Sequence, residues 1–300
     1  MHTNVKKAVV IMIICALVTV MTSCLRESET DVLAKITTES KSSQAISSEV
    51  AEKKKTPTDP NIVHYKAKKG IPAIYGAKKA KKKKLTKSQK NEKVAYLTFD
   101  DGPSSITPKV LDVLKKHDIK ATFFVIHHGD KAAKNHMKRI VDEGHQIALH
   151  SWTHDYKKVY ASTASFFKEM SNLQKYVYKV TGVWATEVRF PGGTSNTVTS
   201  RERIKKIIQQ LNKRNMVYHD WNIVSGDAEG KVRSAKSINK KIFKEKEILK
   251  QKEVVVLMHD VARNKGTLGA LPKIIKGLKK KGFRFDTTSN MRSPIQHRKY

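Results

Sequence analysis

Short apolar runs alternate with helix-length amphipathic segments from Val94 to Thr288, and this alternation restricts the possible folds more than any other feature of the chain. Runs of a few apolar residues are typical of buried strands, and apolar residues three and four positions apart indicate helices. We expect strands at 94–99, 121–126, 146–150, 187–190, 216–223, 253–259 and 283–288, and helices at 107–118, 165–180, 201–214 and 271–282. This order predicts a parallel sheet with crossover helices, either closed into a barrel or open, with ligands bound at the carboxyl ends of the strands.

The first 24 residues have the pattern of an export signal. Two lysines precede an apolar stretch from Ala8 to Met21, and small residues follow it up to Cys24. This stretch is shorter than the roughly 20 residues that a membrane span needs. The tetrapeptide MTSC at its end resembles the lipobox of bacterial lipoproteins, in which Cys24 would become the lipidated N-terminus. The alternatives are an ordinary cleaved signal and an uncleaved anchor. All three place most of the chain outside the cytoplasm, at the extracellular face of the cell membrane or in the cell wall.

Residues 25–92 have the composition of a disordered basic linker. Between positions 53 and 93 the chain has 15 lysines and only two acidic residues, Asp59 and Glu92. Low hydrophobicity combined with high like charge favours an unfolded, self-repelling segment. Within it, residues 61–76 contain enough apolar side chains to pack locally or on the main domain.

The whole chain carries a formal net charge of +33, which favours polyanionic partners. We expect the lysine-rich linker to contact anionic wall polymers or lipid headgroups, or to act only as a solvated spacer. Because the chain carries an export signal, nucleic acid is not expected as a partner.

Reactive residue types follow the ends of five of the expected strands. They are Asp100 with Asp101, His150 with His154, Arg189, Asp227, and His259 with Asp260. Two histidines and a carboxylate with open positions form hydrolytic metal sites, in which the metal lowers the pKa of water and polarises a carbonyl oxygen. Each group alone also has a structural explanation, such as a turn, a helix cap, a buried hydrogen bond or an ion pair. Because all five occur in order at strand ends, we interpret them as one catalytic site.

Five segments carry these residues: TFDDGP (98–103), HSWTH (150–154), RFPGG (189–193), VSGD (224–227) and LMHD (257–260). In this order they resemble the five motifs of the polysaccharide deacetylase family, the NodB-homology domain of carbohydrate esterase family 4. The resemblance covers about two thirds of the chain. It implies a catalytic domain over 93–290 with a distorted (β/α)7 barrel fold, followed by a basic C-terminal tail at 291–300.

The resemblance also implies a role for each residue. The predicted ligands of a divalent metal, most often Zn²⁺ with Co²⁺ as an alternative, are Asp101, His150 and His154. Asp100 would be the general base that takes a proton from water, oriented by Arg189. His259 would be the general acid that protonates the leaving amine, oriented by Asp227. The segment after Pro191, beginning at Gly192, would supply a backbone N–H to the oxyanion.

Three positions depart from the family pattern. Gly192 stands where an aromatic residue is frequent, Val224 replaces an aspartate, and Ala228 replaces a tryptophan. We expect the glycines of RFPGG to remove one wall of the substrate groove, and either Trp221 or Trp152 to cover the space left at Ala228.

These features predict a metal-dependent hydrolase that removes N-acetyl groups from an extracellular amino-sugar polymer. The export signal and the basic linker favour peptidoglycan, with N-acetylglucosamine as the sugar. The alternatives are a deacetylase of chitin or poly-N-acetylglucosamine, and a wall- or glycan-binding lipoprotein without turnover.

Overall fold

The computed structural model describes residues 59–78, 86, 91–230 and 232–300. The expected export signal, Cys24 and the greater part of the expected linker lie outside these residues. Among the described helices, none combines the length and the apolar character that a membrane span requires.

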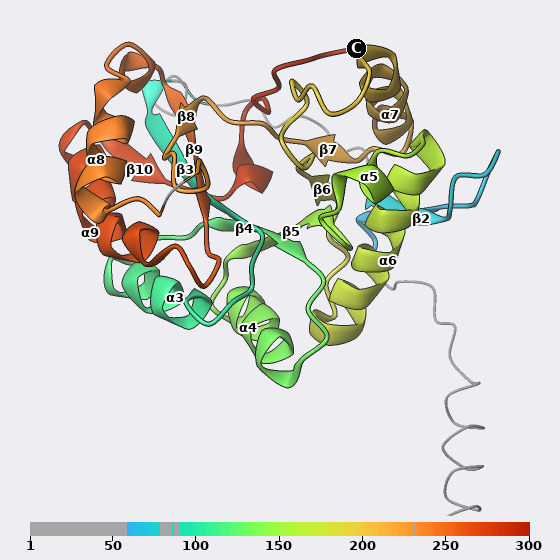
Figure 1. Ribbon diagram of the computed structural model, residues 1–300, viewed down its shortest axis with the longest axis horizontal. Coiled ribbons are helices and arrows are strands. Elements are labelled where there is room, and N and C mark those ends of the chain that lie inside the picture. Colours follow the sequence, from blue (N-terminus) through green and yellow to red (C-terminus); the bar gives the residue numbers. More distant parts are fainter. Residues whose placement is uncertain (1–58, 79–85, 87–90, 231) are drawn as a thin grey trace, which may run out of the picture. The chain divides into compact units, whose positions relative to one another are not determined.

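A curled parallel sheet forms the centre of the unit that residues 59–300 make (Figure 1). Its strands are hydrogen-bonded in the order β7-β6-β5-β4-β3-β9-β8, and β10 pairs with the start of β3 beside this path. The bounds are β3 (Lys93–Asp100), β4 (Thr122–Ile126), β5 (Gln146–Ser151), β6 (Glu187–Val188), β7 (Val217–Tyr218), β8 (Ile223–Val224), β9 (Glu253–His259) and β10 (Phe283–Phe285). The seven strands of the path make a half-barrel, which confirms the predicted distorted (β/α)7 architecture.

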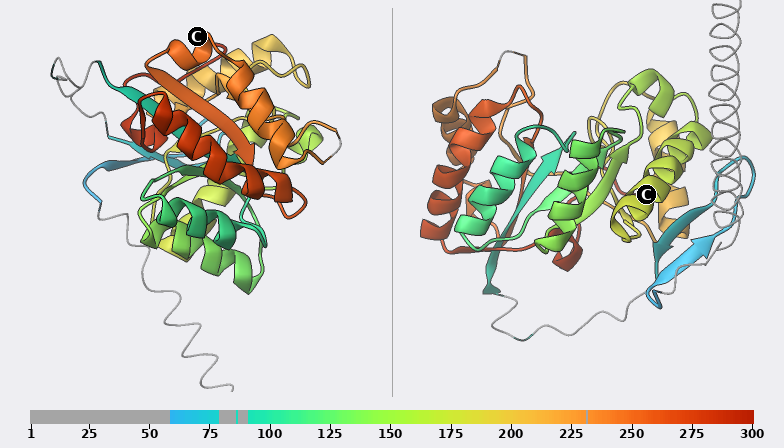
Figure 2. Two further views of the ribbon diagram at one scale, coloured as in Figure 1. Left: turned by 90° about the vertical axis from the view of Figure 1, so that its left-hand side faces the viewer. Right: turned by 90° about the horizontal axis from the view of Figure 1, so that it is seen from below.

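Helices cover the outside of this sheet, and Figure 2 shows α9, α3, α4 and α6 following one another along it. The α-helices are α3 (Thr107–Lys116), α4 (Lys131–Asp142), α5 (Tyr156–Val159), α6 (Thr163–Thr181), α7 (Arg201–Lys213), α8 (Ala235–Lys244) and α9 (Lys265–Lys280), with short 3-10 turns η1 (Ile248–Lys250) and η2 (Thr288–Asn290). Four of them confirm the predicted helices. The other three, α4, α5 and α8, were not among the predicted ranges, although each begins at a side-chain cap, Asp130, Asp155 and Ser234 respectively.

The single strand expected at 216–223 is wrong, because the structure divides this segment between the two ends of the sheet. β7 pairs with β6, whereas β8 pairs with β9. Asp220 and Trp221 lie between them and cross the open side of the half-barrel. The C-terminal tail supports this crossing, since the carbonyl of Ile295 accepts a hydrogen bond from the backbone N–H of Asp220 at 2.7 Å.

Successive side chains of β3 face opposite sides of the sheet, as expected for a strand. Ala95, Leu97 and Phe99 belong to the main core beneath the helices. Val94 and Tyr96 face the inside of the half-barrel, where they meet a smaller cluster that contains Val255, Trp221, Met291 and Ile295. Thr98 and Asp100 continue this inner face, so the strand delivers a carboxylate to the inside of the half-barrel at its carboxyl end.

The expectation of disorder throughout 25–92 is wrong for residues 59–78. There, β1 (Ile62–Tyr65) and β2 (Ile74–Ala77) form an antiparallel hairpin. It packs on α6, where Gln174 exchanges two hydrogen bonds with the backbone of Tyr75, at 2.8 and 2.6 Å. Ile71 and Ile74 are buried in the main core. These apolar contacts outweigh the local positive charge, as the alternative of a packed segment at 61–76 anticipated.

Candidate active site

The three predicted metal ligands converge at the carboxyl ends of β3 and β5. Asp101 Oδ1 lies 3.4 Å from His150 Nε2 and 3.2 Å from His154 Nε2. This Oδ1 atom is buried and has no hydrogen-bond partner among the described residues. Tetrahedral zinc ligands at about 2.0–2.1 Å from the ion are separated by about 3.3 Å, so the observed spacing fits a divalent cation. The three side chains also form the one group of metal-ligating type found in the described part of the chain.

Two of these ligands occupy unusual backbone conformations. Asp101 has φ of 67° and His154 has φ of 54°, in the left-handed region that only a few per cent of non-glycine residues adopt. The turn at Asp101 is held by β4, because the N–H of Asp101 donates to the carbonyl of Phe124 at 3.2 Å. Such strain persists only where the surroundings impose it, and here it directs both side chains toward a common point.

The tautomer of His150 is set by a backbone hydrogen bond. Its Nδ1 lies 2.8 Å from the carbonyl oxygen of Arg189, which can only accept, so Nδ1 carries the proton and Nε2 presents a lone pair. Burial lowers the pKa of His150 to about 3. The neutral form, which can ligate a metal through Nε2, is therefore the one present at neutral pH.

Asp100 lies beside this group and is paired with a buried arginine. Arg189 Nη1 donates to Asp100 Oδ1 at 2.8 Å and to Thr98 Oγ1 at 2.7 Å. The remaining guanidinium nitrogens donate to the carbonyls of His219 and Asp220, and the ring of Phe124 lies 4.0 Å below the guanidinium carbon. Burial raises the pKa of Asp100, and the charge of Arg189 opposes that shift.

His259 lies directly opposite Asp100 on the neighbouring strand, because the two residues are register partners of β3 and β9. Its Nδ1 lies 2.8 Å from Asp227 Oδ1, and its backbone N–H donates to Asp227 Oδ2 at 2.7 Å. Burial lowers the pKa of His259, but the hydrogen bond and charge of Asp227 outweigh this effect and raise the pKa to about 9. Thr267 Oγ1 also donates to Asp227, which fixes the carboxylate from a third direction.

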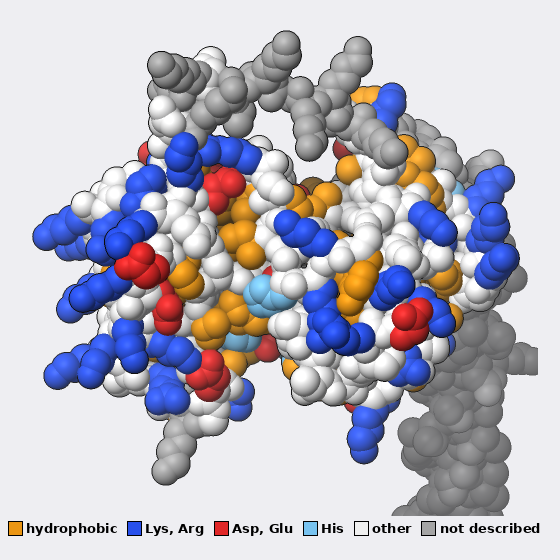
Figure 3. All heavy atoms as spheres, turned by 90° about the horizontal axis from the view of Figure 1, so that it is seen from above, with side chains coloured by type: hydrophobic (Ala, Val, Ile, Leu, Met, Phe, Trp, Pro, Cys, Tyr) orange, Lys and Arg blue, Asp and Glu red, His pale blue; other side chains and the backbone are white. Residues whose placement is uncertain are grey.

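A pocket of about 380 Å³ opens onto these groups. Figure 3 shows histidine side chains in a hollow at the middle of one face, bordered by hydrophobic side chains. The predicted residues that line the pocket are Asp100, Asp101, His150, His154, Gly192, Asp227 and His259. Arg189 does not line the pocket; its side chain is fully buried and contacts Asp100. Val224 and Ala228, the two departures in the fourth motif, also line it.

The structure explains the two glycines of RFPGG and corrects the expectation of a lost wall. A Cβ at Gly193 would lie 2.8 Å from the Trp221 ring, so the indole occupies the space that a side chain at 193 would need. A Cβ at Gly192 would lie 3.3 Å from the hydroxyl of Tyr156. Trp221 and Tyr156 therefore form part of the pocket wall. Trp152 instead stacks on His127, with 3.7 Å between ring centroids.

Several pocket residues were not predicted as site residues. They are Tyr156, Gly226, Glu229, Leu257 and Arg263, together with Trp221, which was considered only as a possible cover. Tyr156 follows His154 by two positions, and Leu257 precedes His259 by two on the same face of β9. A search for side chains that share a strand face or a turn with a predicted residue would have found both.

Asp260 supports the turn between β3 and α3 without lining the pocket. Its Oδ2 accepts a hydrogen bond from Thr107 Oγ1 at 2.5 Å, and a Cβ at Gly102 would collide with its carboxylate. This close approach explains why glycine follows the two aspartates of TFDDGP.

Comparison with known proteins places this geometry in a family. The family described as polysaccharide deacetylase matches residues 87–215. The chain is 35% identical to YheN of Bacillus subtilis over 70% of this chain and 72% of that protein. It is 34% identical to a peptidoglycan-N-acetylglucosamine deacetylase of Bacillus cereus over 66% of this chain and 70% of that one. The chain belongs to the polysaccharide deacetylase family.

Solved structures agree with this assignment. The catalytic domain of peptidoglycan N-acetylglucosamine deacetylase from Eubacterium rectale superposes with a TM-score of 0.65 at 31% identity, over 73% of this chain and 97% of that domain. Some relatives are much longer: the match covers 40% of a Listeria monocytogenes peptidoglycan-N-acetylglucosamine deacetylase. The relatives from Bacillus cereus, Eubacterium rectale and Listeria monocytogenes are named as deacetylases, and all five segments from TFDDGP to LMHD contribute residues to one pocket of this chain.

Proposed function

We propose that this protein is a metal-dependent N-deacetylase of an extracellular amino-sugar polymer, with the N-acetylglucosamine of peptidoglycan as substrate. One observation carries the proposal. A buried carboxylate oxygen, which has no hydrogen-bond partner in the described part of the chain, lies between two histidine nitrogens, and a paired carboxylate and a paired histidine flank it from adjacent strands. The names of the relatives from Bacillus cereus and Eubacterium rectale support the choice of sugar.

Asp101, His150 and His154 would hold the divalent cation, with Zn²⁺ preferred and Co²⁺ as an alternative. When bound there, the cation polarises the acetamide carbonyl and lowers the pKa of a nearby water. Two histidines and one carboxylate are a donor set that zinc hydrolases use.

Asp100 would act as the general base. Its carboxylate is buried, so its pKa is raised and it accepts a proton more readily than an exposed aspartate would. The Arg189 guanidinium holds one oxygen at 2.8 Å, which leaves Oδ2 for the proton of the attacking water. Loss of that proton allows the water oxygen to form a bond with the carbonyl carbon of the acetamide.

His259 would act as the general acid. Asp227 holds its Nδ1, so Nε2 is the nitrogen that gives a proton to the amide nitrogen as the carbon–nitrogen bond breaks. A pKa of about 9 keeps the ring protonated at neutral pH. The products are acetate and a free sugar amine. The backbone N–H of the segment after Pro191 would stabilise the oxyanion from the pocket wall.

The location and the partners are also part of this proposal. Residues 1–24 would export the chain, with Cys24 as the lipidated residue, and the lysine-rich linker would contact anionic wall polymers or lipid headgroups. Mass spectrometry of the mature N-terminus decides between lipidation, simple cleavage and an uncleaved anchor.

Acetate release from purified peptidoglycan by the full chain, with Zn²⁺ or Co²⁺ added, tests the activity. We expect release from peptidoglycan to exceed release from chitin oligomers or poly-N-acetylglucosamine. Mass spectrometry of the digested product should find the free amine on glucosamine rather than on muramic acid. No release from any of these polymers by folded, metal-loaded protein would favour the second candidate, a wall-binding protein without turnover, which the changes at Val224 and Ala228 motivate.

A further inference from the structure

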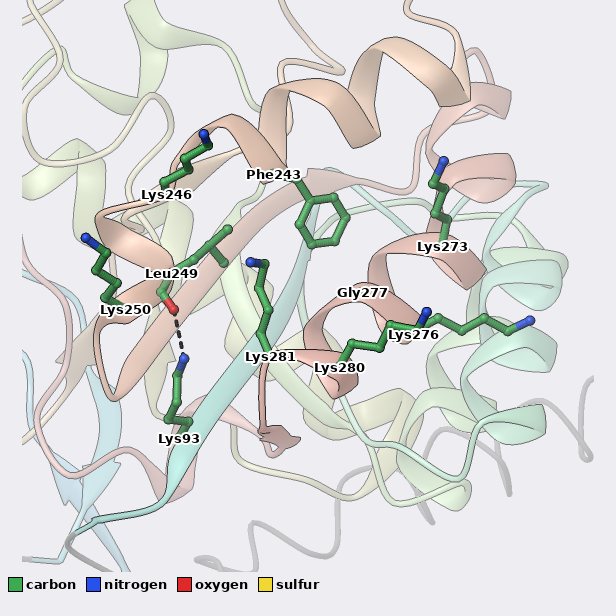
Figure 4. A pocket seen from close by; sticks show the side chains of 10 residues that line it. All are labelled: Lys93, Phe243, Lys246, Leu249, Lys250, Lys273, Lys276, Gly277, Lys280 and Lys281. Atoms are coloured by element: carbon green, nitrogen blue, oxygen red, sulfur yellow. Dashed lines mark hydrogen bonds between the residues drawn. The ribbon is translucent and has the colours of Figure 1, made fainter.

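A second concave site lies away from the catalytic pocket, between the end of α8, η1 and the outer side of α9. Its volume is about 980 Å³, larger than the catalytic pocket. Figure 4 shows its side chains arranged around Phe243 and Leu249. The residues that line this lysine groove are Lys93, Phe243, Lys246, Leu249, Lys250, Lys273, Lys276, Gly277, Lys280 and Lys281.

Few of the described carboxylates compensate the charge of the groove. Seven of its ten lining residues are lysines and none is acidic. In the described part of the chain, the lysines that form ion pairs within 4.0 Å with carboxylates are Lys158, Lys206, Lys241 and Lys250. Of the groove lysines, Lys250 alone is therefore paired with a described carboxylate, that of Glu247, and both side chains of that pair are largely exposed. Such a concentration of like charge costs free energy unless an anion offsets it.

The floor of the groove is apolar and fixed in shape. Leu249 is buried, and the partly buried Phe243 packs on the main core. A Cβ at Gly277 would collide with the Phe243 ring, so this glycine in α9 allows the ring to lie against the helix. Glycine inside a helix is less favourable than alanine. Lys93 is also fixed, because its Nζ donates to the carbonyl of Leu249 at 2.8 Å.

The groove and the catalytic pocket lie at opposite ends of β3. Lys93, which begins the strand, lines the groove, and Asp100, which ends it, lines the pocket. Seven residue steps of about 3.3 Å separate them by about 23 Å. A ligand in the groove therefore leaves the catalytic residues free.

We propose that the lysine groove binds a linear polyanion in which phosphodiester groups alternate with polyol or sugar units. The lysines of the rim match the phosphates, and the apolar floor matches the C–H faces of the units between them. A concave site suits a single chain better than a flat bilayer, whose headgroups cannot reach its floor. A second copy of this protein is disfavoured as the occupant because it is also strongly basic.

Binding of soluble poly(glycerol phosphate) to the full chain tests this proposal, since it can be measured whether or not the protein deacetylates a polymer. The groove variant Lys246→Gln/Lys276→Gln/Lys281→Gln removes three exposed lysines from the rim. The matched control Lys131→Gln/Lys168→Gln/Lys175→Gln removes three exposed lysines from α4 and α6. At low salt we expect the groove variant to bind about tenfold more weakly than the control. Its affinity should also depend less steeply on salt concentration.

Hydrogen–deuterium exchange separates the groove from the lysine-rich linker. The polymer should protect peptides that cover residues 243–252 and 272–283 of the wild-type chain. Equal weakening in the groove and control variants, or protection confined to peptides before residue 93, would overturn the proposal. It would also be overturned if phosphatidylglycerol vesicles, rather than the polymer, protected these peptides and lost affinity in the groove variant. Neutral dextran should protect neither segment.

Discussion

Arg189 Nη1 lies 2.8 Å from Asp100 Oδ1, and both side chains are buried. This ion pair joins the carboxyl ends of β3 and the segment after β6, which are separated in the sheet by β4 and β5. The same arginine carries the carbonyl that orients His150. One residue therefore positions the proposed base and one proposed metal ligand.

Loss of this arginine should destabilise the fold. Arg189→Met leaves the Asp100 carboxylate buried without its partner, and breaking a buried pair in this way costs about 3–5 kcal/mol in the free energy of unfolding. Urea denaturation followed by circular dichroism measures this loss. The double variant Asp100→Asn/Arg189→Met should lose less than the sum of the single losses. Strict additivity would contradict a direct interaction.

Asp100→Asn should remove the base without removing the metal. An amide cannot take the proton of the attacking water, so kcat should fall by on the order of 10²–10⁴-fold. The zinc content of the purified protein, measured by inductively coupled plasma mass spectrometry, should match that of the wild type. Full activity of this variant would show that another group is the base.

His150→Ala should abolish metal binding, because one of three ligands and its backbone-oriented nitrogen are lost. We expect substoichiometric zinc after dialysis and no acetate release. Thr153→Ala, in the same turn, retains all three ligands and serves as the control. Normal zinc content in His150→Ala would place the metal elsewhere.

The pH dependence of activity should reveal the pair of His259 and Asp227. The pKa of His259 is raised above its usual value to about 9. The ring therefore carries its proton below that pH and loses it as the pH rises through about 9. Activity limited by this acid should therefore decline above about pH 9. Asp227→Asn removes the charge that raises the pKa, and the alkaline decline should move to lower pH. An unchanged profile would exclude His259 as the acid.

Gly193→Ala tests the position of Trp221. The added methyl group would lie 2.8 Å from the indole, so the ring must move away from its place in the pocket wall. We expect KM for the polymer to rise several-fold while zinc content stays constant, since no ligand is touched. Steady-state kinetics would contradict this account if KM were unchanged.

Local patterns in the sequence predicted most of the fold. Apolar runs located β3, β4, β5 and β9, because a strand buried on both faces needs continuous apolar side chains. The prediction of a single strand at 216–223 failed, because the short strands β7 and β8 are defined by their partners, β6 and β9, rather than by their own composition. The hairpin at 62–77 was not predicted with certainty, because its exposed lysines give the segment the composition of a disordered linker although a few apolar side chains are buried.

The sequence alone determined the types of reactive residue, their order and their places at strand ends, because these follow from local chemistry and strand length. Only the tertiary structure decided which groups meet. The register of β3 with β9 sets Asp100 opposite His259, and the left-handed turns at Asp101 and His154 aim two proposed metal ligands at one point. Packing also placed Trp221 on Gly193 and gathered the groove lysines from β3, α9 and the segment after α8. Such contacts join residues far apart in the chain, and no local pattern encodes them.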